Sequence, residues 1–283
     1  MTDFILANEP TLRLGCFFGI LAVMALWEVV APRRALSQSK AVRWYSNLGI
    51  VVVNSLVVRL LFPMAAVGIA VLAAERGWGL LNTTVWTSIF PAWITFLLAV
   101  VILDFAIYLQ HVLFHAVPAL WRLHRMHHAD LDFDVTTGAR FHPIEIVLSM
   151  IIKMAMVAAL GPSAIAVIIF EIVLNLTAMF NHANVGLPLA LDRFLRLFVV
   201  TPDMHRVHHS IVRNETNSNF GFNLPGWDRL FGTYRAQPAA GHTDMIIGIE
   251  QFRDAPALHL HRMLVQPFAA PADTYPINHE DRT

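Results

Sequence analysis

The sequence predicts an all-α, polytopic membrane helical bundle with a cytoplasmic, histidine-rich helical cap that holds a dinuclear metal site. Three observations lead to this fold class. Hydrophobic residues make up 56% of the 283 residues and charged residues only 14%, against about 25% charged in a typical soluble domain. Several apolar runs are long enough to cross a bilayer. All 14 histidines follow residue 110, and most of them lie in three short clusters.

Four apolar runs define the membrane part, at residues 14–31, 47–74, 90–114 and 144–180. A membrane helix needs about 20 residues, so each of the first three runs predicts one span. The fourth is too long for one helix and contains Gly161-Pro162, which predicts a membrane hairpin of two spans. The five spans divide the chain into N-terminal spans and loops (1–98), a histidine-motif catalytic region (99–235) that includes the hairpin, and a C-terminal cytoplasmic tail (236–283).

The basic residues are distributed unevenly between the predicted loops. The loop after the first run holds four of them, whereas the loop after the second run holds only Arg76. The segments around the histidine clusters are also rich in arginine. Because cytoplasmic loops carry the excess of Lys and Arg, we expect the N-terminus outside the membrane and the histidine site and C-terminus in the cytoplasm.

Charge and cysteine content exclude several classes of protein. The 20 basic and 20 acidic residues cancel, whereas a nucleic-acid-binding protein would need a basic excess. A single cysteine, Cys16, excludes intrachain disulfides, cysteine-based zinc sites and cysteine-ligated iron–sulfur clusters.

The histidine clusters have spacings that suit metal binding. Residues three and four apart share one face of a helix, so each cluster can direct its imidazoles to one side. A further histidine, His182, ends the fourth apolar run below a polar stripe formed by Glu171 and Asn175. The predicted metal ligands are His111, His115, His124, His127, His128, His182, His205, His208 and His209.

Eight or nine histidines are too many for one metal ion and fit two. Neutral imidazole suits zinc, copper, iron and nickel. The metalloprotease pattern His-Glu-x-x-His does not occur, which disfavours zinc proteolysis. Two iron ions beside a membrane suit O2-dependent attack on a C–H bond of a lipid, although zinc can replace iron in preparations. A zinc-dependent membrane hydrolase, a membrane metal-binding or transport protein, and a haem protein with paired histidines are the alternatives.

Four further polar residues are candidates for outer-shell partners or extra ligands. Asp104 lies on the same helical stripe as His111 and can hold a histidine ring through its second nitrogen. His142 is either a ligand or an anchor beside a helix start. Asp203 is either the N-cap of the helix that carries His205 or an outer-shell partner. Asn184 follows His182 closely and is the fourth candidate.

The order His-x-x-x-His, His-x-x-His-His, hairpin, His-x-x-His-His resembles the fatty acid hydroxylase / sterol desaturase superfamily, and specifically its bacterial members. Neighbouring motifs extend the resemblance over residues 99–234: Asp132-Phe133-Asp134-Val135-Thr136-Thr137, Arg140-Phe141-His142-Pro143, Asn219-Phe220-Gly221 and Trp227-Asp228-Arg229-Leu230-Phe231-Gly232-Thr233.

This resemblance implies a di-iron enzyme of the bacterial inner membrane that uses O2 and external electrons to hydroxylate or desaturate a lipid, such as a sterol or a fatty acid. It also assigns the metal to the three histidine clusters, with His182 as the extra histidine that many members place after the last membrane helix. The haem-binding signature of cytochrome b5 does not occur in the sequence. We therefore expect electrons from a separate electron-transfer protein, and no bound haem or nucleotide.

Overall fold

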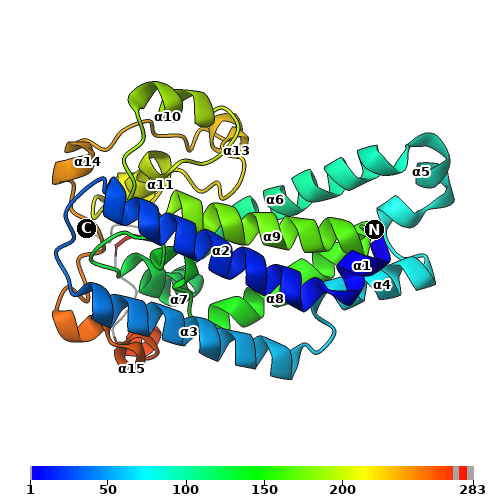
Figure 1. The fold of residues 1–283 in the computed structure, drawn as a ribbon, viewed down its shortest axis with the longest axis horizontal. Helices are drawn as coiled ribbons and strands as arrows, with labels where there is room; N and C mark the ends of the chain where they lie inside the picture. Colours follow the sequence, from blue (N-terminus) through cyan, green and yellow to red (C-terminus); the bar gives the residue numbers. More distant parts are fainter. Residues whose placement is uncertain (1, 270–273, 279–283) are drawn as a thin grey trace.

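The computed structural model describes residues 2–269 and 274–278, and within these ranges it is helical without any β-strand, as predicted. Among these described residues, five segments are long and apolar enough to cross a membrane, which agrees with the predicted number of spans. Figure 1 shows the long helices lying side by side along the length of the molecule. The long helices are α2 (Glu9–Val30), α3 (Lys40–Leu61), α6 (Ala92–Ala116), α8 (Pro143–Leu160) and α9 (Ala164–Asn181).

The second apolar run does not form one continuous helix. It is divided between α3 and the shorter α4 (Ala65–Arg76), with Pro63 in the break between them. Proline has no N–H and its ring clashes with the preceding turn, so the helix ends just before it. The predicted second span therefore consists of two helices, and α4 packs against α8 and α9.

The predicted hairpin is present between α8 and α9. Gly161 ends α8 in the left-handed conformation, with φ of 66°, and Ser163 caps the start of α9 by accepting a hydrogen bond from the Ala166 amide. Glycine is the residue that adopts this conformation without steric cost. A side chain at Gly161 would also collide with the Trp78 carbonyl.

The remaining helices are short, and most of them gather at one end of the bundle (Figure 1). This end, where α6 and α9 finish and α3 begins, is called the histidine end below. Exceptions are α1 (Thr2–Ala7) and α5 (Thr84–Ile89), at the opposite end. The short helices of the histidine end are α7 (Pro118–His128), α10 (Leu189–Leu195), α11 (Pro202–His208), α12 (Arg213–Thr216), α13 (Gly226–Leu230), α14 (Gly241–Asp244), α15 (Leu260–Met263) and α16 (Gln266–Ala269).

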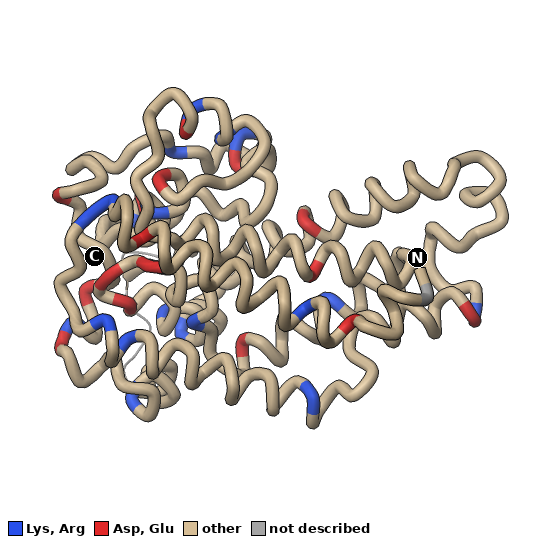
Figure 2. Tube along the Cα trace, viewed as in Figure 1, with Lys and Arg blue, Asp and Glu red and all other residues tan. Residues whose placement is uncertain are grey.

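The surface of the bundle differs from that of the histidine end. Side chains on the outer faces of the spans are apolar and exposed, among them Leu26, Val30, Leu56 and Leu60, as expected for contact with lipid. Most charged residues lie at the histidine end (Figure 2). Of the predicted tail, residues 270–273 and 279–283 lie outside the described part of the chain.

Candidate metal centre

Helices α6 and α7 bring the first two histidine clusters together. α6 carries His111 and His115 on one buried face, and Pro118 begins α7 after a single intervening residue. The two helices then pack side by side. The Nε2 atoms of His111 and His124 lie 3.1 Å apart, and those of His115 and His128 are also 3.1 Å apart.

The third cluster and His182 complete the site from the other side. His182 follows the last residue of α9; α11 carries His205 and His208, and His209 follows its last residue. The His182 Nε2 atom lies 3.2 Å from Nε2 of His127 and 3.1 Å from Nε2 of His205. Gly138 lies in the segment between α7 and α8. A side chain at this position would collide with the Ala178 carbonyl and crowd the His182 ring, so glycine permits the close approach of this segment to α9.

All nine histidines predicted from the sequence meet at the histidine end, and all nine are buried. They fall into two groups, and within each group one candidate ligand atom per residue lies within 4.8 Å of the others. One group contains five residues and the other four. The first group is His111, His115, His124, His128 and His208, and the second is His127, His182, His205 and His209.

Hydrogen bonds to the second ring nitrogen determine how these imidazoles are oriented. In six of the nine rings, Nδ1 forms a hydrogen bond with a protein oxygen, at 2.7 to 3.2 Å. An oxygen of a carbonyl or carboxylate can only accept, so Nδ1 carries the proton and a neutral ring leaves Nε2 with a lone pair. The partners are the Phe220, Arg140, Ala178 and Ser218 carbonyls for His111, His127, His182 and His208, the Glu145 carboxylate for His124 and the Asn217 side-chain oxygen for His115.

This arrangement fits metal ions. In the pairs His111–His124 and His127–His182, both rings donate through Nδ1, so two lone pairs face each other across 3.1 and 3.2 Å. That contact is repulsive without a cation. Two imidazole nitrogens each about 2.1 Å from one metal ion and at right angles would lie about 3 Å apart. The Nε2 atom of His208 and both ring nitrogens of His209 have no protein partner among the described residues, so each of these two rings has a buried nitrogen available to a metal.

Burial keeps the imidazoles in the neutral form that binds metal. Desolvation lowers the pKa of His127, His128, His205, His208 and His209 well below the ordinary value, and the neighbouring imidazoles lower it further. Burial lowers the pKa of His182 to about 3. Neutral imidazole is the metal-binding form, so no proton has to leave these rings at neutral pH before a metal binds.

Two of the four additional candidates have different partners from those expected. We expected Asp104 to hold a histidine ring, but its Oδ2 atom accepts a hydrogen bond from Trp227 Nε1 at 2.8 Å. Asp203 is not the N-cap of α11, because Thr201 accepts the capping hydrogen bond from Met204. Asp203 instead forms an ion pair with Arg33 at 3.0 Å. Sequence reasoning identified the buried faces correctly but not the partners.

The other two candidates lie apart from both groups of histidines. His142 caps α8: its Nδ1 accepts from the Ile144 amide, and its Nε2 donates to the Leu264 carbonyl. Both ring nitrogens are therefore occupied by protein partners. Asn184 hydrogen bonds to the backbone of Arg34 through both side-chain atoms and so connects the end of the last span to the loop after the first.

One supporting residue that the sequence did not single out is Glu145, in the first turn of α8. Its Oε1 atom accepts a hydrogen bond from His124 Nδ1 at 2.7 Å, and the side chain is 6% exposed. The available signal was a carboxylate at the start of an apolar span, where a charge is costly unless it has a partner.

A second feature not foreseen is a buried ion network under the loop after α7. Arg43 of α3 donates to Asp130 at 2.7 and 2.9 Å and also binds Asp134, and all three side chains are fully buried. Burial alone would raise the pKa of Asp130, but Arg43 outweighs it and lowers the pKa to about 2. The network holds the segment between His128 and Arg140, and so supports His127.

Comparisons with known proteins agree with this geometry. Fold and site together define a helical membrane protein with two buried, all-histidine groups that could hold metal ions. Residues 96–233 match the family model described as fatty acid hydroxylase. This match confirms the resemblance that the motifs indicated, over just under half of the chain.

Characterised relatives are lipid-modifying enzymes. The chain is 27% identical over 235 residues to the ornithine lipid hydroxylase OlsE of Rhizobium tropici, covering 81% of this chain and 69% of that protein. It is 33% identical over 150 residues to the alkylglycerol monooxygenase of Xenopus tropicalis, covering 53% of this chain and 31% of that protein. It is 24% identical over 144 residues to the cholesterol 25-hydroxylase of Rattus norvegicus, covering 50% and 47%. The chain thus spans less than half the length of the last two. No solved structure matches.

Proposed function

We propose that this chain is a membrane-bound di-iron oxidoreductase that uses O2 and electrons from a separate protein to hydroxylate a lipid. The observation that carries the proposal is the two buried groups of histidines, one of five residues and one of four. Within each group, ring nitrogens present lone pairs to one another. Hydroxylation is favoured over desaturation because the relatives named above are hydroxylases and a monooxygenase.

In this proposal the histidines bind the metal ions, and the cavity between the spans admits the substrate. When bound, iron would supply the activation of O2 needed to attack a C–H bond. The nine histidines hold the ions, and the Nδ1 hydrogen bonds fix the rings. A cavity of about 320 Å³ begins at His111 and His124 and extends between the spans, which gives an alkyl chain a route from the bilayer to the metal.

We place the histidine end in the cytoplasm, the N-terminus outside, and the protein in a bacterial inner membrane. The support is the positive-inside rule and the basic residues at this end, which are Arg33 and Arg34 in the loop after α2 and Lys40 and Arg43 at the start of α3. Reporter fusions to the loops after α4 and after α9 test this orientation. Activity of a cytoplasmic reporter in the loop after α4 would contradict it.

A single substitution tests the metal assignment. In His208→Ala, iron content and lipid hydroxylation should fall together, because the lost ring is one of the five in its group. His261→Ala, at an exposed position on α15, is the matched control and should keep both. Iron is measured by mass spectrometry and hydroxylation by lipid analysis with O2 consumption. Full iron content and turnover in His208→Ala would refute the assignment.

The same assays address the alternatives. A zinc-dependent membrane hydrolase would act without O2 and without reductant, so O2 consumption coupled to lipid product excludes it. A metal transporter would need ligands along a path across the bilayer, whereas these ligands gather at one end of the bundle. Uptake of metal into sealed vesicles would favour the transporter.

A further inference from the structure

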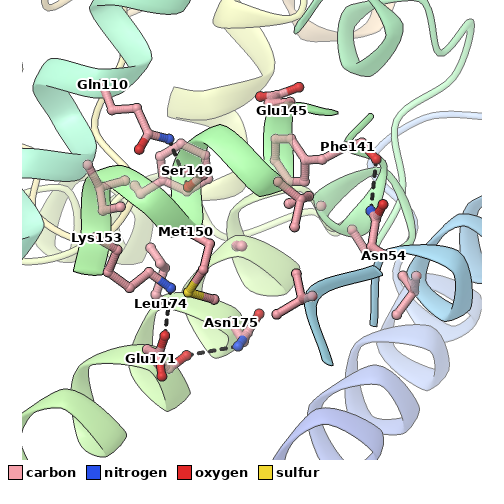
Figure 3. A pocket seen from close by; sticks show the side chains of 18 of the residues that line it. Asn54, Gln110, Phe141, Glu145, Ser149, Met150, Lys153, Glu171, Leu174 and Asn175 are labelled. Atoms are coloured by element: carbon pink, nitrogen blue, oxygen red, sulfur yellow. Dashed lines mark hydrogen bonds and ion pairs between the residues drawn. The ribbon is translucent and has the colours of Figure 1, made fainter. Parts of the chain in front are cut away.

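The cavity that reaches the histidines contains a charged cluster at some distance from them. Glu171 of α9 accepts a hydrogen bond from Lys153 of α8 at 2.6 Å and also binds Arg13 of α2. All three residues line the cavity. Figure 3 shows Lys153 pointing toward Glu171, with Asn175 beside them and Glu145 in another part of the cavity.

The charged cluster is displaced from the metal site along the direction of the membrane spans, and two helices give about the same distance between cluster and site. Along α8, eight residues separate Lys153 from Glu145, the partner of His124, and this is about 12 Å of helix. Along α9, seven residues separate Glu171 from Ala178, whose carbonyl holds His182, or about 10 Å. Most of the lining between them is apolar: Phe17, Ile107, Phe114, Met150, Leu174 and Phe222.

Two cations and one carboxylate line this end of the cavity, and a second carboxylate, Glu9, balances their charge from outside the lining. Arg13 and Lys153 contribute two positive charges, and Glu171 contributes one negative charge. Glu9 pairs with Arg13 at 2.7 Å but does not line the cavity, and its side chain is 26% exposed. An ammonium has three N–H donors and a guanidinium five, so both can bind a further acceptor in addition to Glu171.

Charged side chains inside a membrane span are costly and usually mark a binding or transport function. An anion bound here would lie beside two cationic groups and would accept hydrogen bonds from N–H donors that Glu171 and Glu9 do not use. We propose that Arg13 and Lys153, oriented by Glu171, form a subsite for the anionic group of an amphiphile whose alkyl chain extends along the apolar lining to the histidines. The anionic group is a carboxylate or a phosphate.

This inference rests on the proposed function for the identity of the amphiphile as substrate, but binding can be measured without turnover. The test uses metal-free full-length protein in nanodiscs of zwitterionic lipid, with empty nanodiscs subtracted. Equilibrium dialysis is carried out with dodecanoate, dodecyl phosphate and the uncharged dodecanol. We expect either anionic probe to bind at least about tenfold more tightly than dodecanol, as charge-assisted hydrogen bonds should provide.

Four variants locate the binding. Lys153→Met and Arg13→Met should each weaken binding of the anionic probes about tenfold and leave dodecanol unchanged. Lys153→Arg, which keeps the charge, should retain the preference for anions. Arg59→Met, on an exposed part of α3 outside the cavity lining, is the matched control and should bind like the unmodified protein.

The outcomes separate this inference from the proposed function. Tighter binding of dodecanoate identifies a fatty carboxylate, and tighter binding of dodecyl phosphate identifies a phosphate headgroup; either supports the subsite. Equal binding of dodecanol and the anions overturns it, as do equal losses in Lys153→Met and Arg59→Met. A protein that binds anions as described but never hydroxylates a lipid would refute the proposed function and leave the subsite standing.

Discussion

His127 and His182 are 55 residues apart in the chain, yet their Nε2 atoms lie 3.2 Å from each other while both Nδ1 atoms donate to backbone carbonyls. The two rings therefore present lone pairs to the same point. A long membrane hairpin separates them in sequence, so this contact depends on α8 and α9 returning the chain to the end from which it left.

The two histidine groups should lose metal separately. His182→Ala removes a ligand from the group of four and should lower iron from two ions toward one per chain, because the group of five keeps all its rings. Iron per protein, measured by mass spectrometry against amino-acid analysis, checks this. His261→Ala is again the control. Complete loss of iron in His182→Ala would mean that the two groups act as one cooperative site.

Glu145 should affect metal affinity through His124. Glu145→Ala removes the carboxylate that accepts the Nδ1 hydrogen bond, and loss of such a partner typically costs about 10–100-fold in metal affinity. Competition with a chelator measures the effect. Glu145→Gln keeps an acceptor oxygen without the charge and should lie between the two. Equal affinity in Glu145→Ala and the unmodified protein would show that the contact does not support the metal.

Arg43 should matter for stability far more than a surface arginine. Arg43→Met leaves Asp130 and Asp134 as buried charges without their cation, and breaking a buried pair in this way costs about 3–5 kcal/mol. The melting temperature in detergent should fall accordingly. Arg43→Met combined with Asp130→Asn should recover part of the loss, while Arg59→Met should be nearly neutral. A melting temperature equal to that of Arg59→Met would contradict the assignment.

The metal-free protein should lose stability in mild acid. The folded-state pKa values of His127, His128, His205, His208 and His209 are lowered by burial, whereas in the unfolded chain they return to about 6.5. Below about pH 6.5 the unfolded chain therefore binds protons first, so stability is complete above this pH and falls below it.

Melting temperatures of the metal-free protein from about pH 8 to about pH 5.5, spanning the ordinary histidine pKa, measure this effect. His209→Gln removes one buried imidazole and should reduce the slope. A melting temperature that stays constant over this range would contradict the burial of neutral rings.

Periodicity and spacing were sufficient to predict the helical class, the five spans and the nine histidines that meet at one end. They could not identify partners from distant parts of the chain. The stripe through Asp104 and His111 is buried as expected, but Trp227, 123 residues from Asp104, donates to the carboxylate. Glu145 was not singled out because its role depends on how α7 and α8 pack together. These are tertiary contacts, and local sequence does not encode them.

The Arg43 network also limits how the chain can be divided. The family match begins at residue 96, so a chimaera that joins this histidine-motif region to the first spans of a relative would keep every motif histidine. In such a chimaera, however, Asp130 and Asp134 would pack against the relative's helix in place of α3, which carries Arg43. Functional chimaeras should therefore require that position 43 be exchanged together with the segment 130–137, and in related sequences these positions should vary as a set.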